Sequence, residues 1–333
     1  MTTQALTKKD IVDLLENVSL SDLQKYADAE QRLCCADEVI LRAIIEISNV
    51  CSRDCIYCGI RKANDRQLRY RMSKEEVLAT AEEAGRMGFK TIILQSGEDD
   101  AYSVAELCAI VKEIKSRVDC ALTISFGEKT REEYQSLKQA GADRYLLKFE
   151  TSDQVLYSRL KPGTKLETRL SCLQTLKELG YQVGSGIMVG LPKQDTEILV
   201  EDILLMKKLD LDMISVGPFV SHPDTPLFYE KNGTLERVLR AIAVTRIVTK
   251  NAHIPVTTST EVLGAQARVA AFSFGANVIM VNVTPDQYIR SYDIYPNPER
   301  GKYSSAQKLA LAQELILAAG KKPSFDYGHS LKK

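Results

Sequence analysis

The sequence lacks an excess of charge of either sign, a long hydrophobic run and an N-terminal targeting segment. Its 333 residues carry 44 basic and 44 acidic side chains, so no overall field attracts nucleic acid or an anionic membrane. No stretch approaches the roughly 18 uninterrupted apolar residues of a membrane span, and the N-terminus does not have the pattern of a signal peptide. We therefore expect a cytoplasmic protein with no nucleic-acid and no membrane partner. A small polar substrate or a transient protein partner fits this composition better.

Apolar runs are short, and they alternate with amphipathic helical patterns. The sequence predicts eight strands, at residues 41–49, 90–98, 121–128, 143–150, 182–191, 213–220, 254–262 and 277–285. A helical pattern fills each of the seven gaps between them, and another follows at 304–320. Such alternation is typical of a parallel sheet covered on its outer face, and eight units predict an α/β fold of the (β/α)8 TIM-barrel type.

No glycine-rich fingerprint follows the first predicted strand, although the rival fold, a doubly wound open sheet, would be expected to carry one there. No internal repeat, low-complexity tract or polar linker marks a second domain. Residues 6–34 have the pattern of one or two helices. We therefore expect a helical extension over residues 1–40, the barrel over 41–325 and a C-terminal tail over 326–333. The active site of such a barrel lies at the C-terminal ends of its strands.

Eight cysteines are many for a reducing compartment, where structural disulfides are rare. Only Cys51, Cys55 and Cys58 cluster, in a C-x3-C-x2-C pattern directly after the first predicted strand. A closed zinc site takes four ligands, and of the three histidines only His222 follows a predicted strand and could reach the cluster. An iron–sulfur cubane on three thiolates would leave one iron open for chemistry. Zinc, a disulfide and a chance grouping of cysteines remain as alternatives.

The cysteine pattern, with the aromatic Tyr57 directly before its last member, resembles the radical S-adenosylmethionine (radical SAM) superfamily. The resemblance implies a 4Fe-4S cluster on Cys51, Cys55 and Cys58, whose remaining iron is chelated by the amine and carboxylate of SAM. It also implies that one electron cleaves SAM and that the resulting 5'-deoxyadenosyl radical abstracts hydrogen from the substrate. An electron donor such as a flavodoxin or ferredoxin is the implied protein partner.

Longer stretches resemble the HydE family of FeFe-hydrogenase maturases. They include "CIYCGIRKAN", "TIILQSGED", "LKELGYQVGSGIMVGLP" and "VGPFVSHPDTPL", and the similarity extends over residues 49–295. Biotin synthase and methylornithine synthase are related enzymes. The resemblance implies action on a small sulfur-containing, iron-bound precursor during assembly of the hydrogenase active-site cluster, the H-cluster. It also implies the maturases HydF and HydG as pathway partners.

The same resemblance implies roles for residues at the strand ends. The expected SAM-binding residues are Ser96, Gly97, Glu98, Thr123, Arg144, Glu150, Arg169 and Met188. The residue types of Glu150 and Arg169 are suitable, because a carboxylate accepts hydrogen bonds from ribose hydroxyls or an amine and a guanidinium binds a carboxylate bidentately. The residues expected to line the substrate cavity are Thr257, Thr258, Tyr292 and Tyr295. Each of these residues also has an ordinary structural interpretation, such as an ion-pair partner or a strand-ending turn.

Two features depart from the HydE pattern. Lys148 and Phe149 stand where the family commonly has Arg-His, so a planar guanidinium and an ionisable ring are missing. No cysteine follows Cys172, so the second cluster that some HydE proteins carry is not expected. Two alternatives stay open. One is a HydE-like paralogue with another substrate, of the methylornithine synthase or biotin synthase type, and the other is a non-catalytic iron–sulfur or zinc scaffold.

Overall fold

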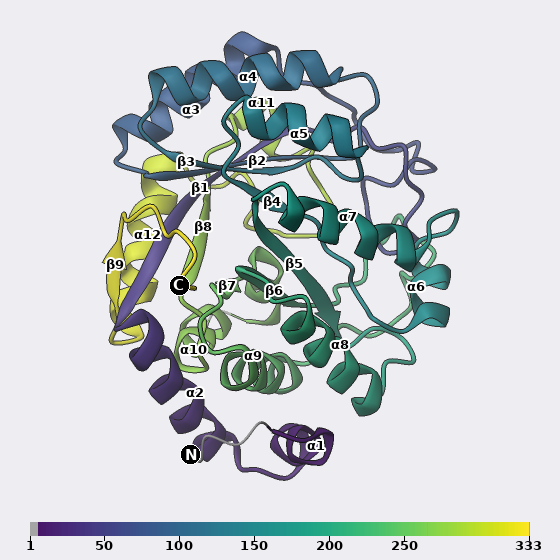
Figure 1. The fold of residues 1–333 in the computed structure, drawn as a ribbon, viewed down its shortest axis with the longest axis vertical. Coiled ribbons are helices and arrows are strands. Elements are labelled where there is room, and N and C mark those ends of the chain that lie inside the picture. Colours follow the sequence, from purple (N-terminus) through teal and green to yellow (C-terminus); the bar gives the residue numbers. More distant parts are fainter. Residues whose placement is uncertain (1–5, 265, 333) are drawn as a thin grey trace.

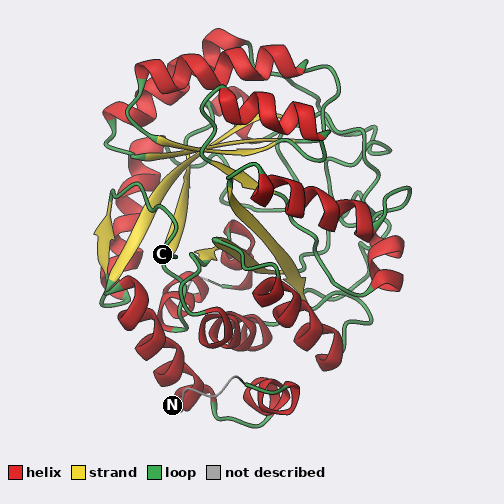
Figure 2. Cartoon of the chain, in the orientation of Figure 1, coloured by secondary structure: helices red, strands yellow, loops and turns green. Residues whose placement is uncertain are grey.

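Eight parallel strands surrounded by helices form the centre of this computed structural model, which describes residues 6–264 and 266–332 (Figure 1, Figure 2). The strands are β1 (Glu38–Ser48), β2 (Thr91–Ser96), β3 (Ala121–Ser125), β4 (Arg144–Leu146), β5 (Gln182–Val189), β6 (Met213–Pro218), β7 (Pro255–Val256) and β8 (Val278–Asn282). Their order in the sheet is β6-β5-β4-β3-β2-β1-β8-β7. The predicted α/β barrel is therefore confirmed.

The ring of strands is nearly closed. Strand β1 pairs in parallel with β2 on one side and with β8 on the other. The weakest joint lies between β6 and β7, where a single bridge connects Met213 to His253 among the described residues. There the Ile214 amide donates to the His253 carbonyl at 2.8 Å. The barrel therefore closes through a few hydrogen bonds at this joint rather than through a full ladder.

Helices cover the outside of the ring in the alternating order that the sequence predicts. They are α3 (Lys74–Arg86), α4 (Val104–Arg117), α5 (Arg131–Gln139), α6 (Gln154–Leu160), α7 (Leu166–Glu178), α8 (Thr196–Lys208), α9 (Leu235–Thr249), α10 (Ala267–Ser273), α11 (Asp286–Ile289) and α12 (Ser305–Ala318). The short helices α6 and α11 lie in loops and have no counterpart in the prediction. In the described part of the chain, none of the helices combines the length and apolar character that crossing a membrane requires.

Several helices begin at a reciprocal cap that is visible in the sequence. Ser73, Ser103, Thr130 and Ser304 precede α3, α4, α5 and α12, and each accepts from the amide three residues later. The side chain of that third residue, a glutamate or glutamine, accepts in return from the cap amide. This pairing satisfies two amides that have no partner within the helix. It fixes where these helices start, and hence the lengths of the loops before them.

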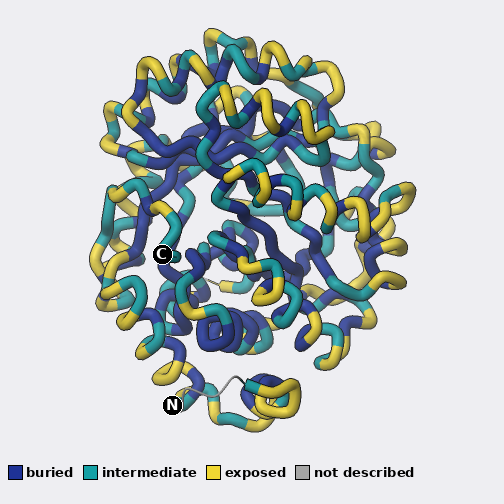
Figure 3. Tube along the Cα trace, in the orientation of Figure 1, coloured by how far each residue is buried: buried dark blue, intermediate teal, exposed yellow. Residues whose placement is uncertain are grey.

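Two N-terminal helices, α1 (Lys8–Glu16) and α2 (Leu20–Cys35), pack on the outside of the barrel beside α9 (Figure 1). Arg240 of α9 donates to the Val18 carbonyl at 2.8 Å, and Lys8 pairs with Glu201 of α8. Buried apolar side chains fill the layer between strands and helices. Figure 3 shows that the central strands consist largely of buried residues. Every residue of β1 after Glu38 is buried, because one face packs on helices and the other faces the barrel interior.

The seventh strand is shorter than predicted. The sequence predicts a strand over 254–262, but β7 ends at Val256 and a 3-10 helix, η1 (Thr258–Leu263), follows. Pro255 has no amide to donate to a ladder. The Thr257 hydroxyl lies 2.9 Å from both the Ser259 and the Thr260 hydroxyls, and such local side-chain bonds compete with strand pairing. The turn brings these hydroxyl groups to the C-terminal rim of the barrel.

The C-terminal residues lie against the opposite rim, where the strands begin. Strand β9 (Lys322–Ser324) pairs with the start of β1. Beyond it, the Tyr327 carbonyl accepts from the Thr91 hydroxyl at 2.7 Å, and the Gly328 carbonyl accepts from Arg144 at 2.9 Å. The segment therefore covers the N-terminal end of the barrel. Access to the interior is correspondingly expected from the C-terminal rim.

Candidate active site

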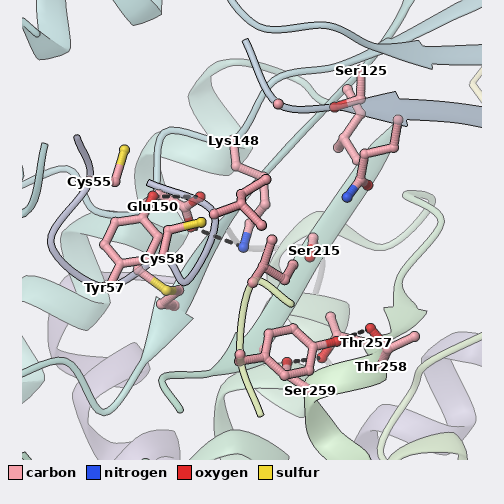
Figure 4. A pocket seen from close by; sticks show the side chains of 18 of the residues that line it. Cys55, Tyr57, Cys58, Ser125, Lys148, Glu150, Ser215, Thr257, Thr258 and Ser259 are labelled. Carbon is pink, nitrogen blue, oxygen red and sulfur yellow. Dashed lines mark hydrogen bonds and ion pairs between the residues drawn. The ribbon is translucent and has the colours of Figure 1, made fainter. Parts of the chain in front are cut away.

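One cavity opens at the C-terminal rim and extends into the barrel (Figure 4). It is lined by most of the residues that the sequence singles out: Cys51, Cys55, Cys58, Ser96, Gly97, Glu98, Glu150, Arg169, Met188, Thr257, Thr258, Tyr292 and Tyr295. In Figure 4, Cys55, Cys58 and Glu150 lie together on one side, and Thr257, Thr258 and Ser259 lie together on another. The cavity thus joins a region rich in thiols and charges to a region rich in hydroxyl groups.

The cysteine loop follows β1 and is folded around a single arginine. Arg69 donates to the carbonyls of Asn49 at 2.7 Å and Ile60 at 2.8 Å through Nη1. Through Nη2 it donates to the carbonyls of Arg61 at 2.6 Å and Asn64 at 3.0 Å. A guanidinium has donors in a fixed fork, so one side chain fixes both ends of the loop. The sequence reasoning did not identify this residue, because a basic residue after the motif has no periodic signal.

Replacing Arg69 with methionine is expected to loosen the cysteine loop. Four carbonyls lose a charged donor, which we expect to lower the free energy of unfolding by about 3 kcal/mol and to reduce the iron retained after anaerobic reconstitution. The matched control is Arg66→Met, because Arg66 is largely exposed and only pairs with Asp224. Unfolding curves and iron analysis of the two variants provide the comparison. Equal iron content in both would contradict this role for Arg69.

The three cysteines are free; Cys55 is buried, and Cys51 and Cys58 are partly buried. Burial raises the pKa of Cys51, and burial together with the neighbouring Cys55 and Cys51 raises the pKa of Cys58. Buried thiols with raised pKa values become thiolates at neutral pH when a metal replaces their protons. Among the described residues, no group of three or more His, Cys, Asp and Glu side chains is arranged for a metal ion. A closed zinc site takes four ligands, so a donor set of three thiols fits an iron–sulfur cluster with one open iron better than a mononuclear zinc ion.

His222 does not supply a fourth ligand in this arrangement. Its Nδ1 accepts from the Asp224 amide at 3.0 Å, and its Nε2 lies 3.2 Å from Asp293 Oδ2. The ring packs under the cysteine loop, where a Cβ at Gly59 would lie 2.4 Å from His222 Nε2 and 2.1 Å from the Asp293 carbonyl. Only glycine allows this close approach. His222 therefore supports the loop, and the fourth position faces the cavity.

Two arginines and two glutamates form a network beside the cysteine loop, in which Arg169 is buried and the other three are partly buried. Arg169 of α7 contacts Glu98 Oε1 at 3.1 Å and Glu128 Oε1 at 2.9 Å. Arg53 contacts Glu98 Oε2 at 2.7 Å and Glu128 Oε2 at 3.3 Å. Burial opposes the charge of Glu98, but Arg169 and Arg53 keep its pKa below the ordinary value. The network is neutral overall, and Arg169 has N–H groups beyond the two that meet Glu98 and Glu128.

Glu150 is held in a backbone conformation that non-glycine residues rarely adopt, with φ of 68°. Its amide donates to the Gly186 carbonyl at 2.9 Å and its carbonyl accepts from the Met188 amide at 3.0 Å. Its carboxylate accepts a hydrogen bond from the Tyr57 hydroxyl at 3.4 Å and lies 3.0 Å from Lys148 Nζ (Figure 4). Strain of this kind costs of order 1–3 kcal/mol and tends to occur at functional sites. It directs the Glu150 carboxylate into the cavity beside the cysteines.

A buried carboxylate behind the site fixes this conformation. Asp202 of α8 is fully buried, and its Oδ1 accepts from the Ser152 hydroxyl at 2.6 Å and from the Thr151 hydroxyl at 3.2 Å. Its Oδ2 accepts from Gln194 at 3.1 Å, and Gln194 also donates to the Met188 carbonyl at 2.9 Å. Asp202 therefore connects the chain after Glu150 to the end of β5. The sequence reasoning missed it because Asp202 lies within an ordinary amphipathic helix.

The Asp202→Asn variant is expected to remove a pH dependence of stability. Burial raises the pKa of Asp202 to about 6, above the ordinary value of about 3.9. The folded state then binds more protons than the unfolded state between those pH values, so this carboxyl group lowers stability as pH rises from about 4 to about 6. The free energy of unfolding of wild type relative to the variant should fall over that range. A difference that rises or stays constant in urea unfolding curves contradicts the assignment.

The hydroxyl-rich part of the cavity comes from the ends of the later strands. The Thr258 hydroxyl contacts the Tyr295 hydroxyl, and Gln95 donates to the Tyr292 hydroxyl at 3.0 Å. The structure adds polar lining residues that the sequence reasoning did not select: Glu46, Gln95, Ser125, Lys148, Lys161, Ser215, Ser259 and Asn282. Every second residue of a barrel strand faces the interior, and this alternation could have pointed to some of them. Without exact strand limits, however, it does not tell which of these residues line the cavity.

Two predicted SAM-binding residues lie elsewhere, and their assignment is corrected. Arg144 is the first residue of β4, at the N-terminal rim, where it donates to the Gly328 carbonyl. Thr123 is in register with Arg144 on β3, and neither residue lines the cavity. Residues at the start of a parallel strand belong to the rim opposite the active site. The two residues that depart from the HydE pattern lie in different places: Lys148 lines the cavity, whereas Phe149 is buried in the core.

Comparison with known proteins agrees with this geometry. Residues 45–203 match the Radical SAM superfamily. The FeFe hydrogenase maturase subunit HydE of Thermotoga maritima is 46% identical over 325 residues, which cover 95% of this chain and 92% of that protein. A 3-methylornithine synthase of Methanosarcina acetivorans is 28% identical, over 82% of this chain and 79% of that protein.

Solved structures show the same fold. A crystal structure of methylornithine synthase (PylB) superposes with a TM-score of 0.82 at 23% identity, covering 97% of this chain and 95% of that one. The maturase HydG superposes with a TM-score of 0.81 at 20% identity, covering 97% and 73%. Identity at these levels supports the fold alone. The sequence relationship to HydE goes further, and the chain therefore belongs to the radical SAM superfamily as a HydE-like radical SAM enzyme, a class that uses a 4Fe-4S cluster and SAM.

Proposed function

We propose that this enzyme acts in FeFe-hydrogenase maturation, on a small sulfur-containing, iron-bound precursor of the H-cluster. The observation that carries the proposal is the arrangement of the cavity. Three free thiols open onto it without a fourth protein ligand among the described residues. Charged and hydroxyl groups suited to a cofactor and a small substrate share that same cavity. The relationship to the Thermotoga maritima HydE supports this choice among radical SAM reactions.

Cys51, Cys55 and Cys58 would hold one 4Fe-4S cluster, and no cysteine after Cys172 is available for a second. When bound, the cluster and SAM would supply a 5'-deoxyadenosyl radical. The chain's own contribution is to fix the three thiols on a loop that Arg69 and Gly59 hold in place. Burial of the thiols keeps water away from the reacting groups. A flavodoxin or ferredoxin would supply the electron.

Glu150, Arg169 and Glu98 would bind SAM, with Ser96, Gly97 and Met188 lining the same part of the cavity. The Glu150 carboxylate is suited to accept from an amine or ribose hydroxyls, and the remaining donors of Arg169 are suited to a carboxylate. Gly97 permits close packing here, since a Cβ there would lie 2.2 Å from the Val50 carbonyl and 2.9 Å from Cys51 Cβ. Thr257, Thr258, Tyr292 and Tyr295 would contact the substrate.

The proposed pathway role is tested by genetic complementation. A strain that lacks its own maturase of this type, but keeps HydF and HydG, should regain FeFe-hydrogenase activity when it expresses this chain. The matched control is the Cys55→Ala variant, which should not restore activity although it is made in the same amount. Failure of the wild-type chain to restore activity, when the purified protein cleaves SAM, would reject the maturation role and retain the radical chemistry.

A HydE-like enzyme with another substrate is the second candidate, and Lys148 favours it. Its ammonium group lines the cavity and pairs with Glu150, at a position where HydE proteins commonly have arginine. An ammonium is a compact point charge, whereas a guanidinium forms a planar bidentate fork. The site is therefore suited to a differently shaped anionic group. Formation of methylornithine from free lysine by the purified enzyme would establish this alternative.

A further inference from the structure

Glu46 of β1 is a buried carboxylate that none of the roles above uses. Its side chain is 7% exposed and lines the cavity, on the same face of β1 as Ile44 because side chains alternate along a strand. Two hydrogen bonds hold its backbone: the amide donates to the Thr284 hydroxyl at 2.8 Å, and the carbonyl accepts from the Tyr70 hydroxyl at 2.7 Å. The position of this carboxylate is therefore fixed by its surroundings.

Oε2 of Glu46 has no hydrogen-bond partner among the described residues, although it is fully buried. The nearest cation is Arg300, whose Nη1 lies 3.8 Å away and already donates to the Tyr292 carbonyl. The other carboxylates of the cavity wall are closer to their cations: Glu150 lies 3.0 Å from Lys148, and Glu98 lies 2.7 Å from Arg53. Arg300 therefore only partly balances the charge of Glu46 and leaves Oε2 without a hydrogen bond.

The groups around Glu46 restrict which kind of ligand could pair with its carboxylate. Gln95, its direct partner on β2, donates its amide to the Tyr292 hydroxyl. Burial raises the pKa of Glu46, while Arg300, the side chain of Asn282 and the charge of Lys308 oppose this shift. A buried carboxylate without a hydrogen bond is costly, and a cationic N–H donor offsets that cost better than a neutral one. Glu46 lines the same cavity as the cysteines, so a small ligand in the cavity can lie beside its carboxylate.

We propose that Glu46 is a substrate-binding residue that accepts a hydrogen bond from a protonated amino group. This assignment rests on the proposed function in one respect, because it takes the ligand of this cavity to be the substrate of the enzyme. It predicts that the substrate, or the organic part of an iron-bound substrate, carries a primary ammonium or an equivalent cationic N–H group. Glu46 is not one of the residues proposed to bind SAM. Its replacement should therefore weaken binding of the substrate and leave SAM binding intact.

The experiment is a calorimetric titration of the anaerobic, cluster-loaded enzyme with n-propylammonium, in the presence of saturating SAM because SAM itself carries an ammonium group. The Glu46→Gln variant keeps the shape of the side chain and removes its charge, and it should weaken n-propylammonium binding at least about tenfold. 1-Propanol, a neutral molecule of the same size, should show no such dependence. Glu299→Gln is the matched control, because Glu299 pairs with Lys302 outside this cavity and its loss changes the net charge equally.

A decrease that is the same in Glu46→Gln and Glu299→Gln, or the absence of one, would overturn the proposal. Thermal unfolding shows whether Glu46→Gln is folded; if it is not, Glu46→Asp replaces it and should weaken binding by a smaller factor. SAM cleavage without added substrate is measured on the same samples and should be equal in wild type and Glu299→Gln, because Glu299 lies outside this cavity. An enzyme that cleaves no SAM but loses n-propylammonium binding in Glu46→Gln would reject the radical chemistry and retain this carboxylate as an ammonium site.

Discussion

Cys58→Ala is expected to lower both the iron bound after reconstitution and the rate of 5'-deoxyadenosine formation at least about 100-fold, since even residues that only support a metal ligand can cost up to that factor. Cys58 is partly buried and lines the cavity together with Cys51 and Cys55. Two remaining thiolates cannot hold three irons of a cubane. Iron and sulfide analysis, visible absorption and product chromatography measure the effect.

Cys108→Ala is the matched control for this experiment. Cys108 lies on α4, packs against the apolar core and is only partly buried. Its replacement removes a thiol but no group of the cavity, so iron content and SAM cleavage should equal those of wild type. Loss of the cluster in both variants would mean that general stability, rather than the cysteine triad, determines iron binding. A Cys58→Ala protein that retains a full cluster would directly reject the assigned ligand set.

Arg169→Met is expected to reduce stability and SAM binding together. Arg169 is 3% exposed and contacts both Glu98 and Glu128, so its removal leaves two buried carboxylates with Arg53 alone. Breaking a buried ion pair in this way typically costs about 3–5 kcal/mol. The control, Arg131→Met, removes a half-exposed pair with Glu178 and should cost about 1 kcal/mol or less. Urea unfolding curves measure both values.

A double variant separates the structural part of this effect from ligand binding. In Arg169→Met with Glu128→Gln, one of the unpaired carboxylates is neutral, so part of the lost stability should return. SAM affinity should remain low, because the guanidinium that is suited to the SAM carboxylate is still missing. Recovery of SAM binding along with stability would show that Arg169 supports the fold only. Equilibrium binding of SAM to the cluster-loaded variants provides the readout.

Much of the barrel could be predicted because its signals are local. Alternating apolar strands and amphipathic helices require a covered parallel sheet, and the serine and threonine caps mark helix starts. The seventh strand could not be predicted in the same way. The segment after Val256 is rich in threonine and has high strand propensity, but hydrogen bonds between Thr257, Ser259 and Thr260 favour a turn. Such side-chain competition depends on three-dimensional contacts.

The site shows the same division. The cysteine triad and the strand-end residues Glu98 and Glu150 were predictable, because spacing and position relative to strands place them on one rim. Arg144 begins β4 and also stands at the start of the predicted strand, so its position already favoured the opposite rim, and only the family resemblance assigned it to the site. Arg69 binds carbonyls of the cysteine loop that directly precedes it, and Asp202 binds the chain after Glu150 from a distant helix. No local sequence pattern distinguishes them from ordinary charged residues.

Electron paramagnetic resonance of the reduced, cluster-loaded protein tests the central claim most directly. The claim is that Cys51, Cys55 and Cys58 leave one coordination position facing a cavity in which Glu150 and Arg169 bind SAM. Addition of SAM should change the spectrum of the reduced cluster, and isotopic labelling of the SAM amino nitrogen or carboxylate should produce resolvable coupling to it. The same spectrum with and without SAM, in protein that carries a full cluster, would contradict the account.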